Sequence, residues 1–284
     1  MNRIEQQRLE FIDIAKGIGI ICVVSGHLVG EGGISFKGSL GLQRLIYRFH
    51  MPLFMVISGI LLFNSLKGQD SSKQFVNKKI NKAIHSLLKP YIFWSAIYFV
   101  ISDINQSQSV MSWIPYIFLF RGIAPVWFLA ALFWAEMTSF LILFIFKTKK
   151  IMAVFILLFS ATFLFSIQEY PCENIWIEFL IVTIGRNFVC TFFVLLGWYL
   201  SNYFRSIKTI KDIVILSGVV LILILSEFLR IEGCNLHLFL LGNIIGFFVF
   251  GTAGTFVIII LAKILEISWG GQNYSKDWDE IHLE

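Results

Sequence analysis

The chain has few charged side chains. Only 14% of its 284 residues are Asp, Glu, Lys or Arg, whereas 57% are hydrophobic and 30 are Phe. Soluble domains are about 25% charged and about 45–50% apolar. A water-soluble fold of this length cannot bury so much apolar surface, so the composition excludes a soluble globular protein and indicates that lipid is the solvent.

Cysteine is scarce too: there are four Cys and no C-x-x-C spacing. This number is too small for a disulfide scaffold or a cysteine metal cluster, and we expect no metal site. The first apolar run has no A-x-A-like cleavage site after it, so we expect it to stay in the protein rather than to serve as a signal peptide. The two repeated halves that mark many secondary transporters are absent from the sequence. We therefore expect one integral membrane domain over residues 1–284.

Continuous apolar runs of about 17–25 residues predict membrane-spanning helices. The fold class is therefore all-α, a polytopic transmembrane helix bundle of about eight spans. Two shorter segments, 113–123 and 175–185, are rich in apolar and aromatic residues and are expected to be re-entrant or interfacial. The polar stretch 67–86 is expected to be a basic cytoplasmic loop. The expected spans are 9–29, 45–66, 87–102, 124–146, 151–167, 186–204, 212–228 and 238–264.

The distribution of basic residues predicts the orientation. With the N-terminus inside the cell, most of the 23 Lys and Arg residues fall on inner loops or ends. This bias follows the positive-inside rule, so both termini are predicted to be cytoplasmic. The excess positive charge thus reflects topology rather than nucleic-acid binding. We expect a multi-pass protein of a bacterial inner or plasma membrane.

The first predicted span carries three titratable side chains, Asp13, Lys16 and His27. A charge near the bilayer centre costs roughly 2.5–3.5 kcal/mol even on insertion scales, so such residues usually have a function. At 100° per residue, Lys16 and His27 differ by about 20° and Asp13 and His27 by about 40°, which places all three on one helix face. A structural alternative remains: Asp13 and Lys16 form an ion pair near the inner surface, and His27 lies at the outer interface.

The second span adds Arg48 and His50, close to Pro52. Proline is tolerated best in the first turn of a helix, so we expect the helix proper to start near Pro52 and His50 to lie at its outer end. An antiparallel arrangement of the two spans then brings His27 and His50 together. In the alternative interpretation, His50 caps the helix and Arg48 binds lipid phosphate.

These two segments resemble the membrane-bound acyltransferase family 3, and more closely its fucose 4-O-acetylase-like branch. The matching stretches are FIDIAKGIGIICVVSGH at 11–27, FHMPLFMVISGILL at 49–62, VWFLAALF at 126–133 and FFVLLGWYLSN at 192–202. Lys16 and His27 match the family's motif of a basic residue, a ten-residue gap and a histidine. The resemblance implies an O-acyltransferase that moves an acyl group, usually acetyl, from acyl-CoA to a hydroxyl of a surface or secreted glycan.

The resemblance gives the polar residues expected roles. Histidine is a suitable base near neutral pH, so His27 is the first candidate for the base that deprotonates the acceptor hydroxyl. His50 or Arg48 orients this base or holds the sugar. Lys16 meets the negatively charged end of the donor or holds Asp13.

Further candidates lie on later segments. Trp127 and Phe128 suit stacking on a sugar face, although an interfacial aromatic belt explains them equally well. Glu136 is expected inside the bundle, with pairing to Arg186 as a structural role. The basic stretch 67–89 would attract the phosphates of acetyl-CoA, the expected donor, while no cofactor is expected to remain bound. The expected partners are thus acyl-CoA, a free or lipid-linked glycan acceptor and the bilayer, and no nucleic acid.

Two departures from the family pattern stand out. Many members have Arg where this chain has Lys16, and Lys lacks the planar fork of the guanidinium. The polar segment 267–284 stands where the family has further spans, so the sequence resembles a C-terminally truncated member. Two other functions also remain open: a transporter or flippase-like carrier in which Asp13, Lys16 and His27 form an ion relay, and a non-catalytic remnant of a longer enzyme.

Overall fold

A computed structural model of the chain describes residues 9–30, 39–66, 73–106, 110–123, 126–146, 151–167, 174–206, 218–221 and 235–281. Within these ranges the chain is almost entirely helical, apart from turns and one isolated β-bridge between Asn235 and Leu240. Six of the described helical segments are long and apolar enough to cross a membrane. The prediction of an all-α polytopic bundle is confirmed.

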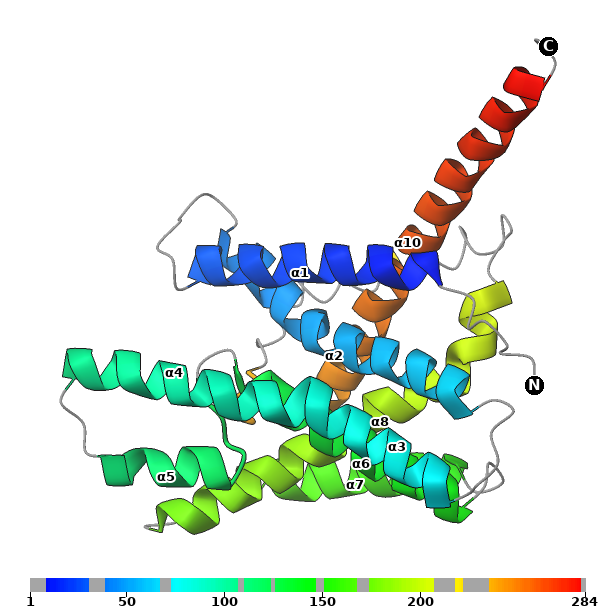
Figure 1. Cartoon of the computed structure of the whole chain (residues 1–284). Helices are drawn as coiled ribbons and strands as arrows, with labels where there is room; N and C mark the ends of the chain where they lie inside the picture. The colour runs from blue at the N-terminus through cyan, green and yellow to red at the C-terminus, as the bar shows by residue number, and fades with distance from the viewer. Residues whose placement is uncertain are drawn as a thin grey trace. The chain divides into compact units, whose positions relative to one another are not determined.

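Figure 1 shows the helices coloured in their order along the chain. The helical elements in the described ranges are α1 (Glu10–Gly30), α2 (Ser39–Leu66), α3 (Lys73–Ala83), the π-helical turn η1 (Ile84–Leu88), α4 (Lys89–Gln106), α5 (Val110–Phe118), α6 (Trp127–Phe146), α7 (Ile151–Ile167), α8 (Ile175–Ser206) and α10 (Ile244–Ile281). The segments able to span a membrane are Glu10–Val29, Leu40–Leu66, Gln74–Ile101, Trp127–Ile145, Ile175–Ser206 and Ile244–Ser268.

The chain divides into two compact units. The first unit comprises Met1–Ile57, Leu200–Cys234 and Gly242–Glu284, and its described part holds α1, most of α2, the end of α8 and all of α10. Helices α1 and α10 pack together, and the backbone N–H of Phe11 donates a 3.1 Å hydrogen bond to Oε1 of Glu266. The other carboxylate oxygen of Glu266 lies 2.7 Å from Nζ of Lys263, which itself lies 4.3 Å from the centroid of the Phe11 ring. The hydrogen bond to Glu266 and the contact of Lys263 with the Phe11 ring together hold the start of α1 against α10.

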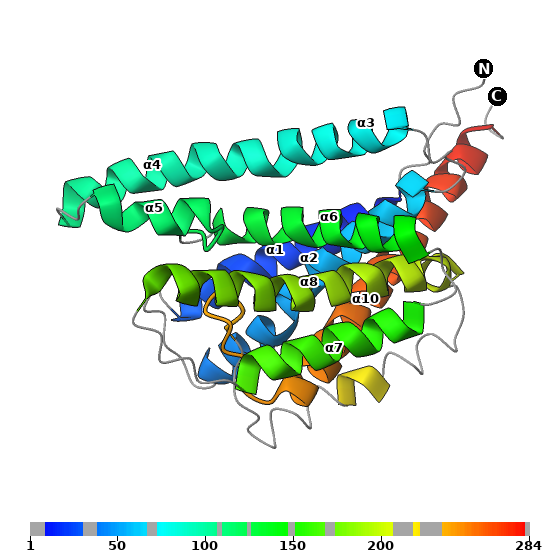
Figure 2. The same cartoon turned by 90° about the horizontal axis from the view of Figure 1, so that it is seen from below.

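The second unit comprises Ser58–Tyr199 and Asn235–Leu241. Its helix α3 continues through η1 into α4 as one long rod (Figure 2). Helix α2 approaches α8 closely at Gly59, where a Cβ atom would overlap the carbonyl oxygen of Val194. Glycine is therefore required at position 59 for these two helices to pack at this distance.

The structure corrects several predicted boundaries. The stretch 67–86 is not a loop throughout, because α3 and η1 cover residues 73–88. Segments 175–185 and 186–204 are not separate, since α8 runs through both as one helix of 32 residues. The bounds predicted for 151–167 are confirmed by α7, but its 17 residues make it a shorter apolar helix and not one of the six candidate spans.

Other predicted segments stand as follows. The predicted span 212–228 lies almost entirely outside the described residues. Segment 113–123 does not span alone: α5 ends at Phe118 and a turn follows. Helix α10 begins at Ile244 and continues to Ile281, so the polar segment 267–284 is helical as far as it is described.

Candidate functional site

Asp13, Lys16 and His27 all lie on α1, which is one continuous helix, so they share a face as expected. Nζ of Lys16 lies 3.9 Å from Oδ1 of Asp13, and the side chains are 40% and 43% exposed. This is the ion pair of the structural alternative, and its exposure means that it contributes at most about 1 kcal/mol to stability. His27, two helical turns or more further along, is exposed. The charged pair therefore leaves His27 accessible for another task.

His27 and His50 are joined by an aromatic ring that the sequence analysis missed. The ring centroid of Tyr47 lies 5.8 Å from that of His27 and 5.2 Å from that of His50. We call these three residues the His27–Tyr47–His50 row. Helix α1 makes room for Tyr47 at Gly26, where a Cβ atom would come within 2.9 Å of the Tyr47 ring. Both imidazoles thus contact the same aromatic ring, that of Tyr47.

The hydrogen bond of His50 settles which of its ring nitrogens carries the proton. Nδ1 of the buried His50 lies 2.8 Å from the carbonyl oxygen of Ile46. A carbonyl oxygen only accepts, so Nδ1 must donate, and in the neutral imidazole the lone pair is then on Nε2. His50 is thereby fixed in orientation and left with one basic nitrogen.

Helix α2 does not begin where the proline suggested. It starts at Ser39, and Pro52 lies inside it, so His50 is in the helix interior and not at its end. Pro52 has no N–H to donate to the carbonyl of Arg48, four residues earlier. The Arg48 side chain is 1% exposed, and its guanidinium lies 5.7 Å from the centroid of the Phe250 ring. This burial does not fit an arginine that binds lipid phosphate at the surface.

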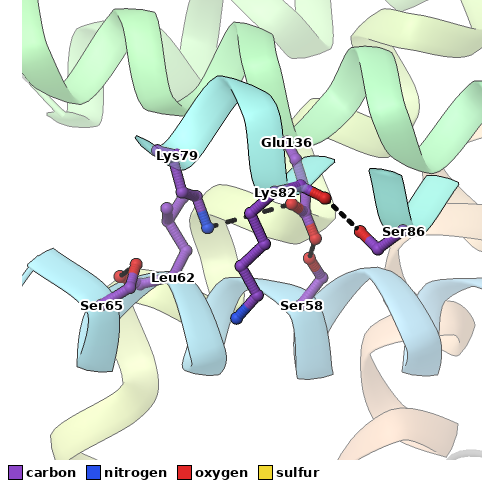
Figure 3. A network of polar contacts seen from close by, with 7 residues as sticks. All are labelled: Ser58, Leu62, Ser65, Lys79, Lys82, Ser86 and Glu136. Carbon is purple, nitrogen blue, oxygen red and sulfur yellow. Dashed lines mark hydrogen bonds and ion pairs between the residues drawn. The ribbon is translucent and has the colours of Figure 1, made fainter. Parts of the chain in front are cut away.

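A second group of polar residues, the Glu136 cluster, consists of Ser58, Lys79 and Glu136 in the second unit (Figure 3). The hydroxyl of Ser58 donates a 2.5 Å hydrogen bond to Oε1 of Glu136, and Nζ of Lys79 lies 4.0 Å from Oε2. The expected pairing of Glu136 with Arg186 is wrong. The carboxylate instead ties α2 and α3 to α6.

Arg186 contacts neutral groups. Its Nη1 donates a 3.1 Å hydrogen bond to the carbonyl of Arg121, and its Nη2 donates a 2.6 Å bond to the carbonyl of Phe120. These carbonyls belong to the turn that follows α5, in which Phe120 and Gly122 have φ of 54° and 78°. Thr183, one turn earlier on α8, donates to the carbonyl of Leu119 at 2.8 Å. Two side chains of α8 therefore cap the C-terminal end of α5, where carbonyls lack helical partners.

Trp127 lies in a cluster with Arg121, Arg186 and His237, which we call the Trp127 cluster. The Trp127 ring stacks on the His237 ring with centroids 5.5 Å apart and planes at 22°, and the Arg186 guanidinium lies 5.1 Å from the indole centroid. Trp127 is only 7% exposed, while Phe128 is half-buried and meets it edge-on. His237 was not among the predicted site residues, and no local signal marks it in the sequence.

The fold and these sites define a helical membrane protein whose titratable side chains meet within its spans. Residues 9–276 match the family model of the acyltransferase 3 group, described as an acyltransferase domain. The match covers most of the chain, and the protein belongs to this family.

Two relatives were found among characterised proteins. The chain is 31% identical over 161 residues to the nodulation protein NolL of Mesorhizobium japonicum (strain LMG 29417 / CECT 9101 / MAFF 303099). It is 31% identical over 160 residues to the nodulation protein NolL of Sinorhizobium fredii (strain NBRC 101917 / NGR234). Each match covers 52% of this chain and 39% of the relative. No solved structure matches the chain significantly.

Proposed function

We propose that the protein is a membrane O-acyltransferase that moves an acyl group, acetyl in the simplest case, from acyl-CoA to a hydroxyl of a glycan. Family membership supports the reaction class. The observation that carries the proposal is the His27–Tyr47–His50 row, which combines one exposed and one buried imidazole on adjacent helices. The proposed location is a bacterial cell membrane, with both termini in the cytoplasm.

The reaction requires a base and a leaving thiolate. The acceptor oxygen attacks the thioester carbonyl carbon while His27 takes the hydroxyl proton. The carbon–sulfur bond then breaks, and the same proton passes from His27 to the departing sulfur. The products are a sugar ester and free CoA, so no other reactant is needed.

His50 is assigned a positioning role because it is buried and His27 is exposed. Its Nδ1 donates a hydrogen bond to the carbonyl oxygen of Ile46. This bond fixes the neutral tautomer, in which Nε2 is a hydrogen-bond acceptor. The Tyr47 ring contacts both imidazoles and keeps their spacing. This assignment makes His27 the catalytic base and makes His50 and Tyr47 the residues that hold it in place.

The donor carries phosphates and needs positive charge. Lys78 and Lys82 are exposed on α3, whereas Lys79 is engaged by Glu136. Their charges favour CoA phosphates over neutral thioesters. Lys16 is a further candidate for the donor's negative groups, since its pair with Asp13 is exposed and easily exchanged.

The test uses purified protein in lipid nanodiscs with radiolabelled acetyl-CoA and candidate glycans. We expect labelled glycan and an equal amount of free CoA thiol, with the His27→Ala variant about 10²–10⁴-fold slower. The matched control is Leu28→Ala, which changes an exposed neighbour on α1. Transfer by His27→Ala at the wild-type rate would reject His27 as the base. In sealed proteoliposomes of the same protein, glycan movement across the bilayer without release of CoA would favour a carrier instead.

A further inference from the structure

The segment Asn235–Leu241 forms a small hairpin that packs on the second unit. Asn235 and Leu240 exchange two backbone hydrogen bonds of 2.7 and 2.9 Å, and the Asn235 side chain accepts a third from the N–H of Leu238 at 3.1 Å. The hairpin therefore holds its own shape without help from a neighbouring strand.

The side chains of the hairpin differ in their exposure. Leu238 and Leu240 are exposed, whereas Phe239 is buried against α8 at Gly185. A Cβ atom at residue 185 would come within 2.5 Å of the Phe239 ring. Phe239 has a φ of 60°, a conformation that costs a bulky residue about 1–3 kcal/mol and is typical of ligand clamps and switch segments.

His237 contacts two other members of the Trp127 cluster, Trp127 and Arg121. Its imidazole stacks on the Trp127 ring, and its carbonyl oxygen accepts a hydrogen bond from Nη1 of Arg121. A flat ring against an indole, with an oxygen on an adjacent guanidinium, is also the arrangement that a bound sugar with an acidic substituent would adopt.

Arg121 lacks a charged partner inside the cluster. It is 6% exposed, its Nε has no hydrogen-bond partner in the described part of the chain, and its guanidinium lies 5.5 Å from the centroid of the Phe179 ring. Burial lowers the pKa of Arg121, while the nearby Tyr116 and the exposed Glu178 raise it. Arg186, also buried, gives its Nη1 and Nη2 to backbone carbonyls. In the described part of the chain, Arg121 donates to a carbonyl oxygen and forms no ion pair with a carboxylate, so an incoming anion would stabilise its buried charge.

We propose that the hairpin is a lid, that His237 occupies the place of a sugar ring on Trp127, and that the site beneath accepts an acidic sugar whose carboxylate or phosphate binds Arg121. The glycan class rests on the proposed function, but the binding itself needs no acyl donor. Arg121 then selects acidic over neutral acceptors, while Arg186 keeps its structural position on the turn after α5.

The first experiment measures binding by titration calorimetry in phosphatidylcholine nanodiscs. The probes are a tetrasaccharide of galacturonic acid, maltotetraose 1-phosphate and neutral maltotetraose. We expect at least one acidic probe to bind about 10- to 100-fold more tightly than the neutral one, as a charge-assisted hydrogen bond implies. The two acidic arms distinguish carboxylate from phosphate recognition. Equal affinity for all three probes would reject the acidic site.

Variants test Arg121 without relying on one substitution. Arg121→Gln should remove the preference for acidic probes, and Arg121→Lys should retain part of it because the charge remains without the fork. Arg205→Gln, on α8 outside the cluster, is the control and should bind as the wild type does. An unchanged preference in Arg121→Gln would overturn the assignment. If Arg121→Gln does not fold, the affinity of folded Arg121→Lys for the acidic probes is the test. Reduced affinity would support recognition of the anion by the planar guanidinium of Arg121, and wild-type affinity would contradict it.

Hydrogen exchange and the variant His237→Ala test whether the hairpin is a lid. Saturation with the tighter probe should speed hydrogen exchange at the C2 position of the His237 imidazole, because the ring leaves its stack on Trp127 and becomes exposed to solvent. His237→Ala should bind this probe several-fold more tightly, whereas Leu238→Ala should be unchanged. Unchanged or slower exchange, or weaker binding by His237→Ala, would contradict the lid. Acidic binding without acyl transfer would reject only the proposed function, and transfer without Arg121-dependent binding would reject only the lid site.

Discussion

Nδ1 of His50 donates a hydrogen bond to the carbonyl oxygen of Ile46, one helical turn earlier on α2. This bond orients the imidazole along the helix and fixes its tautomer. The same carbonyl belongs to the backbone of α2, so the orientation of His50 depends on the helix continuing through this region. Pro52, two residues further on, is accommodated inside that helix.

The substitution His50→Asn tests the roles of the two ring nitrogens of His50 separately. The Asn amide nitrogen can replace Nδ1 as the donor to Ile46, but Asn offers no basic nitrogen in place of Nε2. We expect acyl transfer to fall at least about 10-fold with little change in thermal stability, as a positioning role for Nε2 implies. Rates and melting temperatures in nanodiscs measure both, and the pH profile of the remaining activity should still report His27. A rate equal to wild type would show that Nε2 has no part in the reaction.

Two substitutions of Lys16 test whether its charge or its shape is needed. Because its ion pair with Asp13 is about 40% exposed, Lys16→Ala should change stability by less than about 1 kcal/mol. If Lys16 binds the donor, Lys16→Ala should raise the KM for acetyl-CoA several-fold, and Lys16→Arg should restore it. A KM that does not change in Lys16→Ala would assign the residue to the ion pair alone.

The Glu136 cluster predicts a graded loss of stability. Glu136→Gln keeps an acceptor for Ser58 but removes the ion pair with Lys79, and Glu136→Ala removes both. We expect losses of roughly 1 and roughly 2–3 kcal/mol, measured by unfolding in mixed micelles. Lys79→Gln should also destabilise the protein, whereas its exposed neighbour Lys78→Gln should not. Equal stability of all four variants would mean that the cluster does not hold the helices together.

Two glycines form a matched pair. A Cβ atom at Gly59 would overlap the carbonyl oxygen of Val194, whereas one at Gly17 would have nothing within 4 Å. Gly59→Ala should sharply reduce the yield of folded protein, because backbone cannot move aside as a side chain can. Gly17→Ala should be neutral or stabilising by about 0.5–1 kcal/mol through helix propensity. Fluorescence-detected size exclusion of the two variants measures this, and similar profiles would contradict the close approach of α2 and α8.

The sequence predicted the spans better than the ends of the helices. Apolar runs report burial in lipid, which is independent of tertiary contacts. The lysines of 73–88 suggested a loop because the apolar side of α3, which carries Ala83 against α6, is short and interrupted by charge. The predicted span 186–204 began at Arg186 because a charged residue interrupts the apolar run there. In the structure Arg186 lies within α8 and donates to a carbonyl of the turn after α5.

The candidate site was foreseen only where spacing determines it. The shared face of Asp13, Lys16 and His27 follows from helical geometry alone. Tyr47 lies three residues before His50 and so on the same face, a signal that was present but not used. His237 is separated from Trp127 by more than a hundred residues, and only the folded chain brings their rings together.

The cap on α5 has a consequence for the order of synthesis. Its donors, Thr183 and Arg186, follow the capped carbonyls by 64 to 66 residues. While the ribosome has completed α5 but not α8, those carbonyls have neither partner, and a turn with open carbonyls is poorly tolerated in hydrocarbon. We therefore expect α5 to remain at the aqueous edge of the bilayer during biogenesis and to take its final place only after α8 has been synthesised.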